Sequence, residues 1–389
     1  MFSITTFNEL LKGLPRATFD QCVRRHNADK YIKQFKHWNH LIAMLYAQLS
    51  GASGLRPLEA GFNSHAAAHH HLGVKPLKRA TLADANENRS DVVFAELARW
   101  LMTQATGAVR REGQELLYLL DSTSVTLKGK LFERWTAGNR TRNTQGIKLH
   151  MLLDAANSAP AWSSFSPANV NDVALAREVP LTKDAVYVCD RGYCDYNWWY
   201  QIDSVGARFV TRFKSNAALE VVQERPLAAE AGTIISDSMV RLKSKQAGRR
   251  KNLYRHALRR VTVARPDKAT PLVLATNDLT SSASQIAQRY KDRWAIELFF
   301  KWIKQHLRIK KFLGESENAV RIQILTALIS YLLVVLYKQR HALSQSLWAC
   351  LCVIRATLFQ RIETDELRKR RRRRTEEAVT LARMQPCLF

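Results

Sequence analysis

The segment Y290-K-D-R-W-A-I-E-L-F-F-K-W-I-K304 decides how the rest of the chain is interpreted. Its pattern predicts an amphipathic helix from about Ser282 to Leu307. Four polar side chains fall on one face of such a helix, at helical spacing: Tyr290, Arg293, Glu297 and Lys304. Apolar side chains lie largely on the other faces: Leu298, Phe299, Trp302 and Ile303. A helix this apolar is normally packed inside a protein, which argues against a simply solvated Glu297. For the segment alone, however, an exposed ladder of ion pairs along the helix is the more common explanation, and the rest of the chain has to decide between the two.

The overall charge of the chain indicates a polyanionic partner. The sequence has 389 residues, of which 46% are hydrophobic, so it can fold as two or three domains. It contains 60 Lys and Arg against 34 Asp and Glu, a net charge of +26. Nucleic acid is the first candidate partner, and an anionic membrane surface is the second.

Several classes of protein are not favoured by the sequence. The first residues lack the basic and apolar segments of a secretory signal, and the apolar stretch Ile324–Tyr337 is shorter than the roughly 20 residues of a membrane span. The six cysteines form no CxxC pair, so we expect a reduced, cytoplasmic protein without a zinc site. The histidines at 65 and 69–71 are interpreted as part of a polar linker within 52–80.

The N-terminal region is predicted to be helical. A helical segment from Asp29 to Leu49 carries basic residues with interleaved aromatic side chains, Tyr31, Phe35 and Trp38. This composition suits a small DNA-contacting domain, but an ordinary basic helix with aromatic residues in the core explains it equally well. A further helix is expected from Thr81 to Leu101.

From Glu115 onward the sequence is typical of an α/β domain, and two apolar strands end in an aspartate. The run L116-L-Y-L-L-D121 predicts a buried strand with Asp121 at or near its end. The run A185-V-Y-V-C-D190 is followed by the turn R-G-Y. Catalytic groups in α/β sheets tend to lie at strand ends, although a lone aspartate there is more often a turn residue or a helix cap.

Asp121, Asp190 and Glu297 together suit metal-dependent phosphoryl transfer. In this chemistry carboxylates hold two divalent cations, one activating the attacking oxygen and the other stabilising the leaving oxygen. An Asp, Asp and Glu set favours Mg²⁺ or Mn²⁺ over zinc, because hard cations prefer oxygen ligands.

Further side chains are candidates for DNA contact. Two flank the second aspartate motif, two follow the next strand, and two alternate on the strand G146–D154: Arg191 and Tyr193, Arg212 and Lys214, Lys148 and His150. A turn role for Arg191 and a solvated edge strand for Lys148 and His150 are the alternatives. The basic loop 243–251 and the arginine run 368–374 suit phosphate groups, or are simply solvated.

These residues resemble the DDE transposases of bacterial insertion sequences, in the group often called the IS-four family. The spacing Y290-x2-R293-x3-E297-x6-K304 matches the Tyr-Arg-Glu-Lys signature of that group, and D121-S-T and D190-R-G-Y resemble its two aspartate motifs. The N-terminal segments D29-K-Y-I-K-Q-F and L82-A-D-A-N resemble the helical domain of one subgroup.

The resemblance implies an α/β fold: an RNase H-like mixed sheet flanked by helices, with a β-rich insertion before the last catalytic helix and a helical N-terminal domain. The implied division is as follows: 1–75 a helical DNA-binding domain, 76–114 a helical connection, 115–215 the first part of the catalytic core, 216–277 the insertion, 278–345 the last part of the core, and 346–389 a helical and basic tail.

The resemblance also implies an activity. Asp121, Asp190 and Glu297 would bind two Mg²⁺ ions, with Mn²⁺ as a substitute, and Tyr290, Arg293 and Lys304 would contact DNA phosphate. The reaction would be cut-and-paste transposition at terminal inverted repeats by a homodimer bound to double-stranded DNA, in the bacterial cytoplasm at the nucleoid. The basic side chains of the signature would then clamp phosphate rather than pair with Glu297.

Two other functions remain open at this point: a DNA-binding protein without catalysis, and a simple metal-dependent nuclease. Some relatives stack a flipped base on a tryptophan of the insertion, and the sequence has no tryptophan between Trp199 and Trp294. That device is therefore absent, or it uses Phe209, Phe213 or Tyr254, and a hairpin intermediate stays open.

Overall fold

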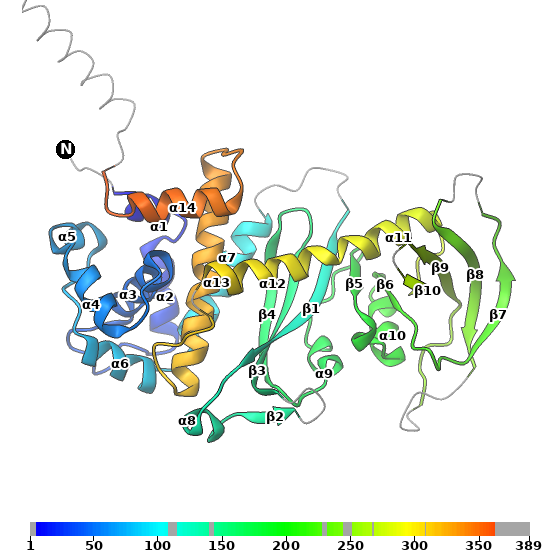
Figure 1. Cartoon of the computed structure of the whole chain (residues 1–389), viewed down its shortest axis with the longest axis horizontal. Coiled ribbons are helices and arrows are strands. Elements are labelled where there is room, and N and C mark those ends of the chain that lie inside the picture. The colour runs from blue at the N-terminus through cyan, green and yellow to red at the C-terminus, as the bar shows by residue number, and fades with distance from the viewer. Residues whose placement is uncertain are drawn as a thin grey trace, which may run out of the picture.

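A helical region, a central mixed sheet and an antiparallel extension follow one another across the molecule (Figure 1). The computed structural model describes residues 5–107, 115–139, 144–227, 232–243, 251–266, 268–307 and 309–361. The arginine run 368–374 and most of the basic loop 243–251 lie outside the described residues.

The N-terminal region is helical. Its helices are α1 (Thr6–Leu11), α2 (Arg16–Arg25), α3 (His37–Ser50), α4 (Leu55–Asn63), the 3-10 turn η1 (Ala66–Ala68), α5 (His69–Leu72), α6 (Arg79–Asn88) and α7 (Val92–Gly107). Three details of the prediction were wrong. Helix α3 begins at His37 rather than Asp29, residues 52–80 include two helices, and the helix expected from Thr81 is divided between α6 and α7.

The buried aromatic and histidine side chains of this region serve packing. Trp38 is buried and donates its indole N–H to the carbonyl of Leu72 at 2.8 Å, whereas Tyr31 is 89% exposed. His69 is buried, and its Nε2 bonds the carbonyl of Phe62 at 2.9 Å. The basic helix with core aromatics therefore explains Trp38, and Tyr31 remains available to a partner.

The sheet is mixed, as its strand order shows. Its strands are β1 (Leu117–Thr126), β2 (Ala137–Asn139), β3 (Thr144–Asp154), β4 (Ala159–Pro167), β5 (Val186–Cys189), β6 (Arg208–Arg212), β7 (Leu219–Glu224), β8 (Ile234–Leu242), β9 (Leu258–Arg265) and β10 (Lys268–Thr276). The order is β2-β3-β1-β5-β6-β10-β9-β8-β7, with β4 paired to β3. Strands β1, β5 and β6 are parallel, and β3 and β10 pair antiparallel on either side of them.

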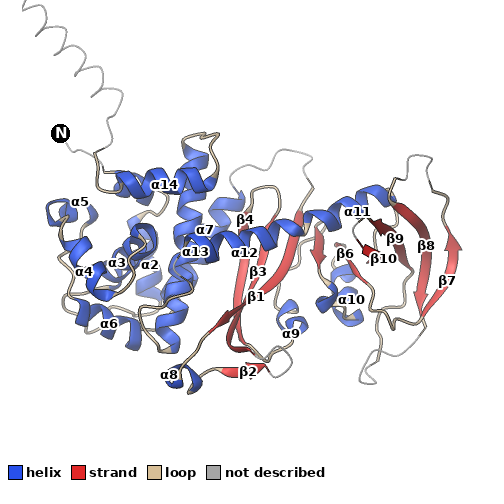
Figure 2. Cartoon of the chain, in the orientation of Figure 1, coloured by secondary structure: helices blue, strands red, loops and turns tan. Residues whose placement is uncertain are grey.

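Strands β7 to β10 extend the central sheet instead of forming a separate one. Strand β10 pairs antiparallel with β6 from Leu274 to Thr276, and β9, β8 and β7 follow outward (Figure 2). The short helices between the central strands are α8 (Lys130–Glu133), α9 (Asp172–Ala176), η2 (Arg191–Tyr193) and α10 (Tyr196–Ser204).

The opening segment forms two helices placed end to end, α11 (Ala283–Asp292) and α12 (Trp294–His306), instead of the single helix predicted (Figure 1). Ser282 and Gln285 form a capping box at the start of α11. Arg293, at the junction, keeps helical backbone angles of −50° and −30°. The two axes therefore stay nearly in line, and the polar face crosses from one helix to the other.

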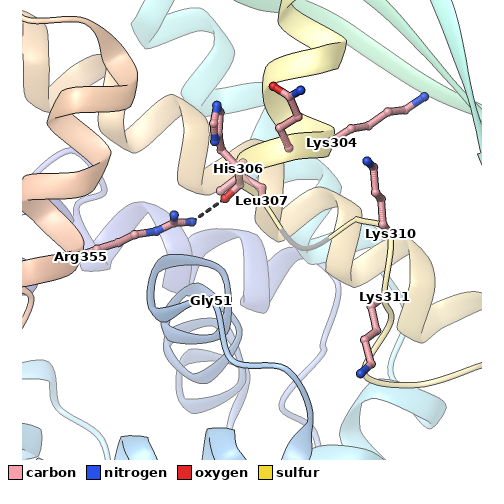
Figure 3. A pocket seen from close by; sticks show the side chains of 8 residues that line it. Gly51, Lys304, His306, Leu307, Lys310, Lys311 and Arg355 are labelled. Atoms are coloured by element: carbon pink, nitrogen blue, oxygen red, sulfur yellow. Dashed lines mark hydrogen bonds between the residues drawn. The ribbon is translucent and has the colours of Figure 1, made fainter.

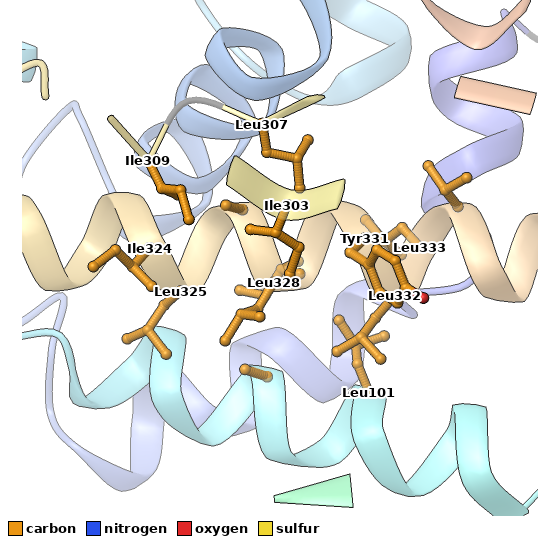
Figure 4. Close-up of a cluster of buried hydrophobic side chains, with 14 of the residues drawn as sticks. Leu101, Ile303, Leu307, Ile309, Ile324, Leu325, Leu328, Tyr331, Leu332 and Leu333 are labelled. Atoms are coloured by element: carbon orange, nitrogen blue, oxygen red, sulfur yellow. The ribbon is translucent and has the colours of Figure 1, made fainter. Parts of the chain in front are cut away.

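Apolar packing fixes α12 in place. Ile303 of α12 and Leu307 beyond it pack with Leu328 of α13 (Glu317–Arg340), which itself packs on α7 (Figure 4). Helix α13 is long and apolar enough to cross a membrane, but 89% of its most apolar window is buried inside the chain. It is therefore a buried core helix of the chain. Helix α14 (Leu347–Thr357) packs against α13 and α3.

Candidate active site

Asp121 lies in the middle of β1, so the prediction that it ends a strand was wrong. Strand β1 continues through Thr126 because it stays paired with β3 from Tyr118 to the end. The polar residues after Asp121 still alternate between the two faces of the sheet. One carboxylate oxygen of Asp121 accepts the backbone N–H of Ser122 at 2.8 Å, and the side chain is 19% exposed.

Asp190 follows β5 directly, as predicted. Its carboxylate accepts the N–H of Gly192 at 2.7 Å and so caps the turn η2. A Cβ atom at Gly192 would lie 2.8 Å from that same oxygen, which explains a glycine at this position. Strands β1 and β5 are parallel with Leu120 opposite Cys189, so the next residues along them, Asp121 and Asp190, lie side by side.

Helix α12 packs against β1 and brings Glu297 to the same place. The Arg293 guanidinium bonds Glu297 Oε1 at 2.5 Å and lies 3.8 Å from Asp121 Oδ2. Arg293 therefore bridges two of the three carboxylates. The ion-pair interpretation is therefore correct for Arg293 in this conformation, and the expectation that Arg293 does not pair with Glu297 was wrong. The contact of Arg293 with phosphate stays a prediction.

The three carboxylates crowd one another electrostatically. The pKa of Asp121 is raised to about 7. Burial is the largest cause, the negative charges of Asp190 and Glu297 add to it, and the Ser122 N–H and Arg293 oppose it. Negative charge is thus in excess here, as in a site that is completed by cations. The donors are all carboxylate oxygens, which suits a hard divalent ion.

The three carboxylates do not converge on a single metal position in this conformation. Within the described ranges, no three His, Cys, Asp or Glu side chains are close enough to hold an ion. The guanidinium of Arg293 lies between Asp121 and Glu297 instead. The chemistry of the residues fits a divalent cation, and in this conformation Arg293 occupies one oxygen of Glu297.

An open pocket of about 420 Å³ lies beside these carboxylates. It is lined by Asp121, Ser122, Thr123, Glu297, Phe300, Lys301, Lys304, Gln305 and Lys310. The ammonium group of Lys304 donates to Thr123 Oγ1 at 2.5 Å and to the carbonyl of Ser124 at 3.2 Å. Thr123, Lys301 and Gln305 were not predicted. Lys301 and Gln305 could have been predicted from the sequence, because they follow Glu297 at helical spacing and so share its face of the helix.

Tyr290 and the residues around the second aspartate differ in accessibility. Tyr290 is 9% exposed and lies under the Arg293 guanidinium, 5.8 Å from the ring centre. Burial raises the pKa of Tyr290, so its hydroxyl stays protonated at neutral pH. Tyr193 is 1% exposed, which argues against a DNA contact in this conformation. Arg191 and Lys214 are exposed, and Arg212 is partly exposed at the end of β6.

Lys148 and His150 were expected near DNA, but they lie on the opposite face of the sheet from Asp121. They pair in register with Ser124 and Ser122, whereas Asp121 pairs with Met151. Lys148 is buried and bonds Asp172 at 2.9 Å, and His150 bonds Ser166 at 2.7 Å. Neither side chain reaches the pocket.

The aromatic candidates for base stacking are core residues. Phe209, Phe213 and Tyr254 are all buried. Phe209 stacks on Trp199 at 5.0 Å, and Phe213 meets the same ring edge-on at 5.9 Å. They therefore belong to the core that packs around α10. None of them is exposed, so the expectation that one of them could stack a flipped base was wrong for this conformation.

Comparison with known proteins assigns the chain to a family. Residues 112–333 match the family described as the transposase DDE domain, and residues 3–75 match a domain of unknown function, DUF4372. The protein named as transposase y4zB of Sinorhizobium fredii is 44% identical over 255 residues, covering 65% of this chain and 69% of its own length.

Two further relatives are named as transposases of insertion sequence elements. The one for IS5377 of Geobacillus stearothermophilus is 31% identical over 56% of this chain and 55% of its own length. The one for IS4SA of Synechocystis is 25% identical over 65% of this chain and 70% of its own. A piggyBac transposase synaptic complex with hairpin DNA has a TM-score of 0.48 and 11% identity, covering 94% of this chain and 80% of that one.

The family match confirms the predicted class of fold, a mixed sheet flanked by helices in the RNase H-like manner with a helical N-terminal region. It also implies dependence on a divalent metal and action on DNA. The chain belongs to the transposase DDE domain family and is a DDE-type DNA transposase.

Proposed function

We propose that this transposase excises and inserts its own insertion sequence by cut-and-paste, using Asp121, Asp190 and Glu297 as its catalytic carboxylates. The adjacency of Asp121 and Asp190 on parallel strands, with Glu297 held over them by α12, is the observation that supports this assignment. The raised pKa of Asp121 among like charges is consistent with it.

These carboxylates would hold two Mg²⁺ ions, or Mn²⁺ in their place. Bound there, the ions would supply activation of the attacking oxygen and stabilisation of the leaving oxygen. The residues of the chain would position the DNA around this chemistry. Water first attacks the phosphodiester at the element end, and the freed 3′-hydroxyl then attacks a phosphodiester of the target DNA.

Arg293 and Lys304 are assigned to the phosphates beside the scissile bond. An ammonium group has three N–H donors, and Lys304 uses two of them on Thr123 and Ser124, which leaves one for a phosphate oxygen. Arg293 can exchange a carboxylate for a phosphate, because guanidinium matches both groups in the same bidentate geometry. Tyr290 would support Arg293 through its ring. Arg191, Arg212 and Lys214 would contact DNA further from the reacting phosphate.

The rest of the chain is assigned by region. Residues 1–75 would bind DNA, 76–114 connect, 115–215 and 278–345 form the catalytic core, 216–277 form the insertion, and 346–389 form a basic tail. The net charge of +26 suits terminal inverted repeats and target DNA as partners. The working form would be a homodimer in a synaptic complex, acting in the bacterial cytoplasm at the nucleoid.

A plasmid carrying the coding sequence with its flanking DNA on both sides tests the proposal. With Mg²⁺, wild-type protein should cut at both flanks and join the excised ends to a second plasmid. Glu297→Gln should still bind but cut more slowly by on the order of 10³-fold or more, because it loses several kcal/mol of transition-state stabilisation. Glu178→Gln, at an exposed glutamate beyond α9, is the matched control.

Each other outcome supports a different function. Cutting without joining indicates a simple nuclease. Binding without any cutting in Mg²⁺ or Mn²⁺ indicates a DNA-binding protein and overturns the proposal. If Glu297→Gln loses binding as well, Glu297 is a structural residue.

A further inference from the structure

A second pocket adjoins the carboxylate pocket and leads away from it. Its volume is about 430 Å³, and it is lined by Gly51, Lys304, Gln305, His306, Leu307, Lys310, Lys311 and Arg355 (Figure 3). The two pockets share Lys304, Gln305 and Lys310, so they form one continuous surface. This surface runs from Asp121 and Glu297 to the junction of α3, α12 and α14.

The charged residues that line this second pocket are positive. Four of its lining residues are Lys or Arg, and within the described part of the chain none is a carboxylate. Burial lowers the pKa of Lys304, and the neighbouring positive charge of Lys310 lowers it further. Such repulsion between cations is relieved when an anion binds between them.

Arg355 contributes to the shape of the pocket more than to its free charge. It donates to the carbonyl of Leu49 at 2.9 Å and to that of His306 at 2.5 Å. It therefore ties the end of α3 to the end of α12. His306 is in turn stacked on Trp348 of α14, with ring centres 3.9 Å apart. The wall of the pocket is thus held by three helices.

The available cations lie on the loop after α12. Lys310 and Lys311 are both exposed, and neither ammonium group has a partner among the contacts that the structure describes. Figure 3 shows Lys310 extending toward the end of the helix that carries Lys304, and Lys311 extending away along the loop. The cations are therefore spread along a path instead of converging on one point.

We infer that Lys304, Lys310 and Lys311 form a phosphate-binding tract for the DNA strand that leads from the cleavage pocket to the junction of α3 and α14. A spread of separate ammonium groups suits successive phosphates of one strand better than a single small anion. Continuity with the carboxylate pocket favours DNA as the polyanion. The inference rests on the proposed function only for the direction of the strand, since the tract binds phosphate whether or not cleavage follows.

The salt dependence of DNA binding tests the tract directly. Binding of a fluorescent DNA duplex of arbitrary sequence is measured by anisotropy in EDTA, over a series of salt concentrations. Each lost phosphate contact should lower the slope of log K against log salt by about 0.9. The double variant Lys310→Ala, Lys311→Ala should therefore lose roughly 2 from the slope. Lys310→Arg with Lys311→Arg should restore it.

Lys183→Ala is the matched control, because Lys183 is exposed and precedes β5 at the end opposite to Asp190. Its slope should stay close to wild type. If the double alanine variant has the same slope as Lys183→Ala, the tract does not bind DNA. If inorganic phosphate binds wild type but not the double alanine variant, while the salt slope of duplex binding is the same for both, the pocket selects a free anion and the DNA assignment is overturned.

These outcomes are independent of the cleavage test. A slope that falls as expected in a protein that never cuts would keep the tract and overturn the proposed reaction. Mg²⁺-dependent cutting with an unchanged slope would do the reverse.

Discussion

Arg289 and Arg293 lie one helical turn apart along α11 and α12, and each of them contacts two carboxylates. Two of these carboxylates, Asp278 and Asp121, have pKa values shifted in opposite directions. Arg289 bonds Asp278 at 2.7 Å and Glu115 at 2.6 Å. The Asp278 side chain is fully buried, and burial by itself would raise its pKa. Hydrogen bonds from Ser281, Thr280 and Arg289 instead hold the pKa of Asp278 well below its usual value.

Arg293 lies against Glu297 and Asp121, and here the balance is reversed. Burial and then the like charges of Asp190 and Glu297 raise the pKa of Asp121 to about 7, and the single backbone N–H that it accepts, from Ser122, does not offset them. The contact with Arg293 at 3.8 Å does not offset burial.

The difference shows that an adjacent arginine does not by itself identify a structural ion pair. What separates the two sites is the number of hydrogen bonds that reach the carboxylate. Asp278 is fully satisfied and belongs to the scaffold. Asp121 is under-satisfied and still has coordination to offer, as expected of a functional carboxylate.

The largest expected effect is the loss of stability on removing Asp278, the carboxylate that is fully hydrogen-bonded. Asp278→Ala should lower the free energy of unfolding by about 3–5 kcal/mol, because it leaves Arg289 and Arg208 buried or half-buried without their shared partner. Urea denaturation followed by circular dichroism measures it. Asp121→Ala serves as the comparison and should cost far less, and equal losses would remove the distinction between the two sites.

The next largest effect is on the pH dependence of the free energy of unfolding, measured in EDTA. The folded-state pKa of Asp121, about 7, lies above its ordinary value of 3.8, so the folded protein binds more protons than the unfolded chain between these values. Stability should therefore fall as pH rises through this window, by at most about 1.4 kcal/mol per unit. Asp121→Asn should flatten that slope in urea titrations. Asp278 has the opposite shift, and its contribution stays constant across the window. A slope unchanged in Asp121→Asn would contradict the raised pKa.

A third carboxylate, Asp172, tests whether the loss of stability depends on the number of hydrogen bonds that a carboxylate accepts. Asp172 accepts bonds from Lys148 at 2.9 Å and from Ser122 at 3.0 Å, fewer than Asp278 receives. Lys148→Met should cost about 1–3 kcal/mol, because it leaves a half-buried carboxylate with one donor. Its affinity for a DNA duplex should equal that of wild type. Weaker DNA binding with unchanged stability would restore Lys148 as a DNA contact.

The smallest effect is expected within the Arg289 network itself. The Glu115 side chain is 34% exposed, whereas Asp278 is fully buried. Glu115→Gln should cost less than about 1 kcal/mol, since water screens an exposed pair. A differential denaturation experiment against wild type measures it. A loss as large as that of Asp278→Ala would mean that the arginine, and not the buried carboxylate, holds the network together.

The sequence predicted the class of fold and the elements that carry the three carboxylates, because apolar runs and helical spacing are local signals. It missed the middle-of-strand position of Asp121, since the polar residues after it were taken as the end of the strand. It also placed Lys148 and His150 on the wrong face. Register with β1 decides that, and register depends on pairing between distant segments.

Two other features had no local signal. The junction at Arg293 carries neither Gly nor Pro, and nothing in its neighbours marks a boundary between α11 and α12. The network around Asp278 joins the turn 278–281 to Glu115, Arg208 and Arg289, which lie far apart in the sequence. Contacts of this kind are fixed by tertiary packing.

The pairing of β10 with β6 gives the insertion a mechanical consequence. A force applied to the outer strand β7 is transmitted through successive rows of backbone hydrogen bonds to β6 and then to β5, which ends at Asp190. An insertion tethered by loops alone would swing without disturbing the sheet. Here, pulling or twisting the outer strands would load β5, which ends at Asp190, the proposed catalytic carboxylate, because all of these strands belong to one hydrogen-bonded sheet.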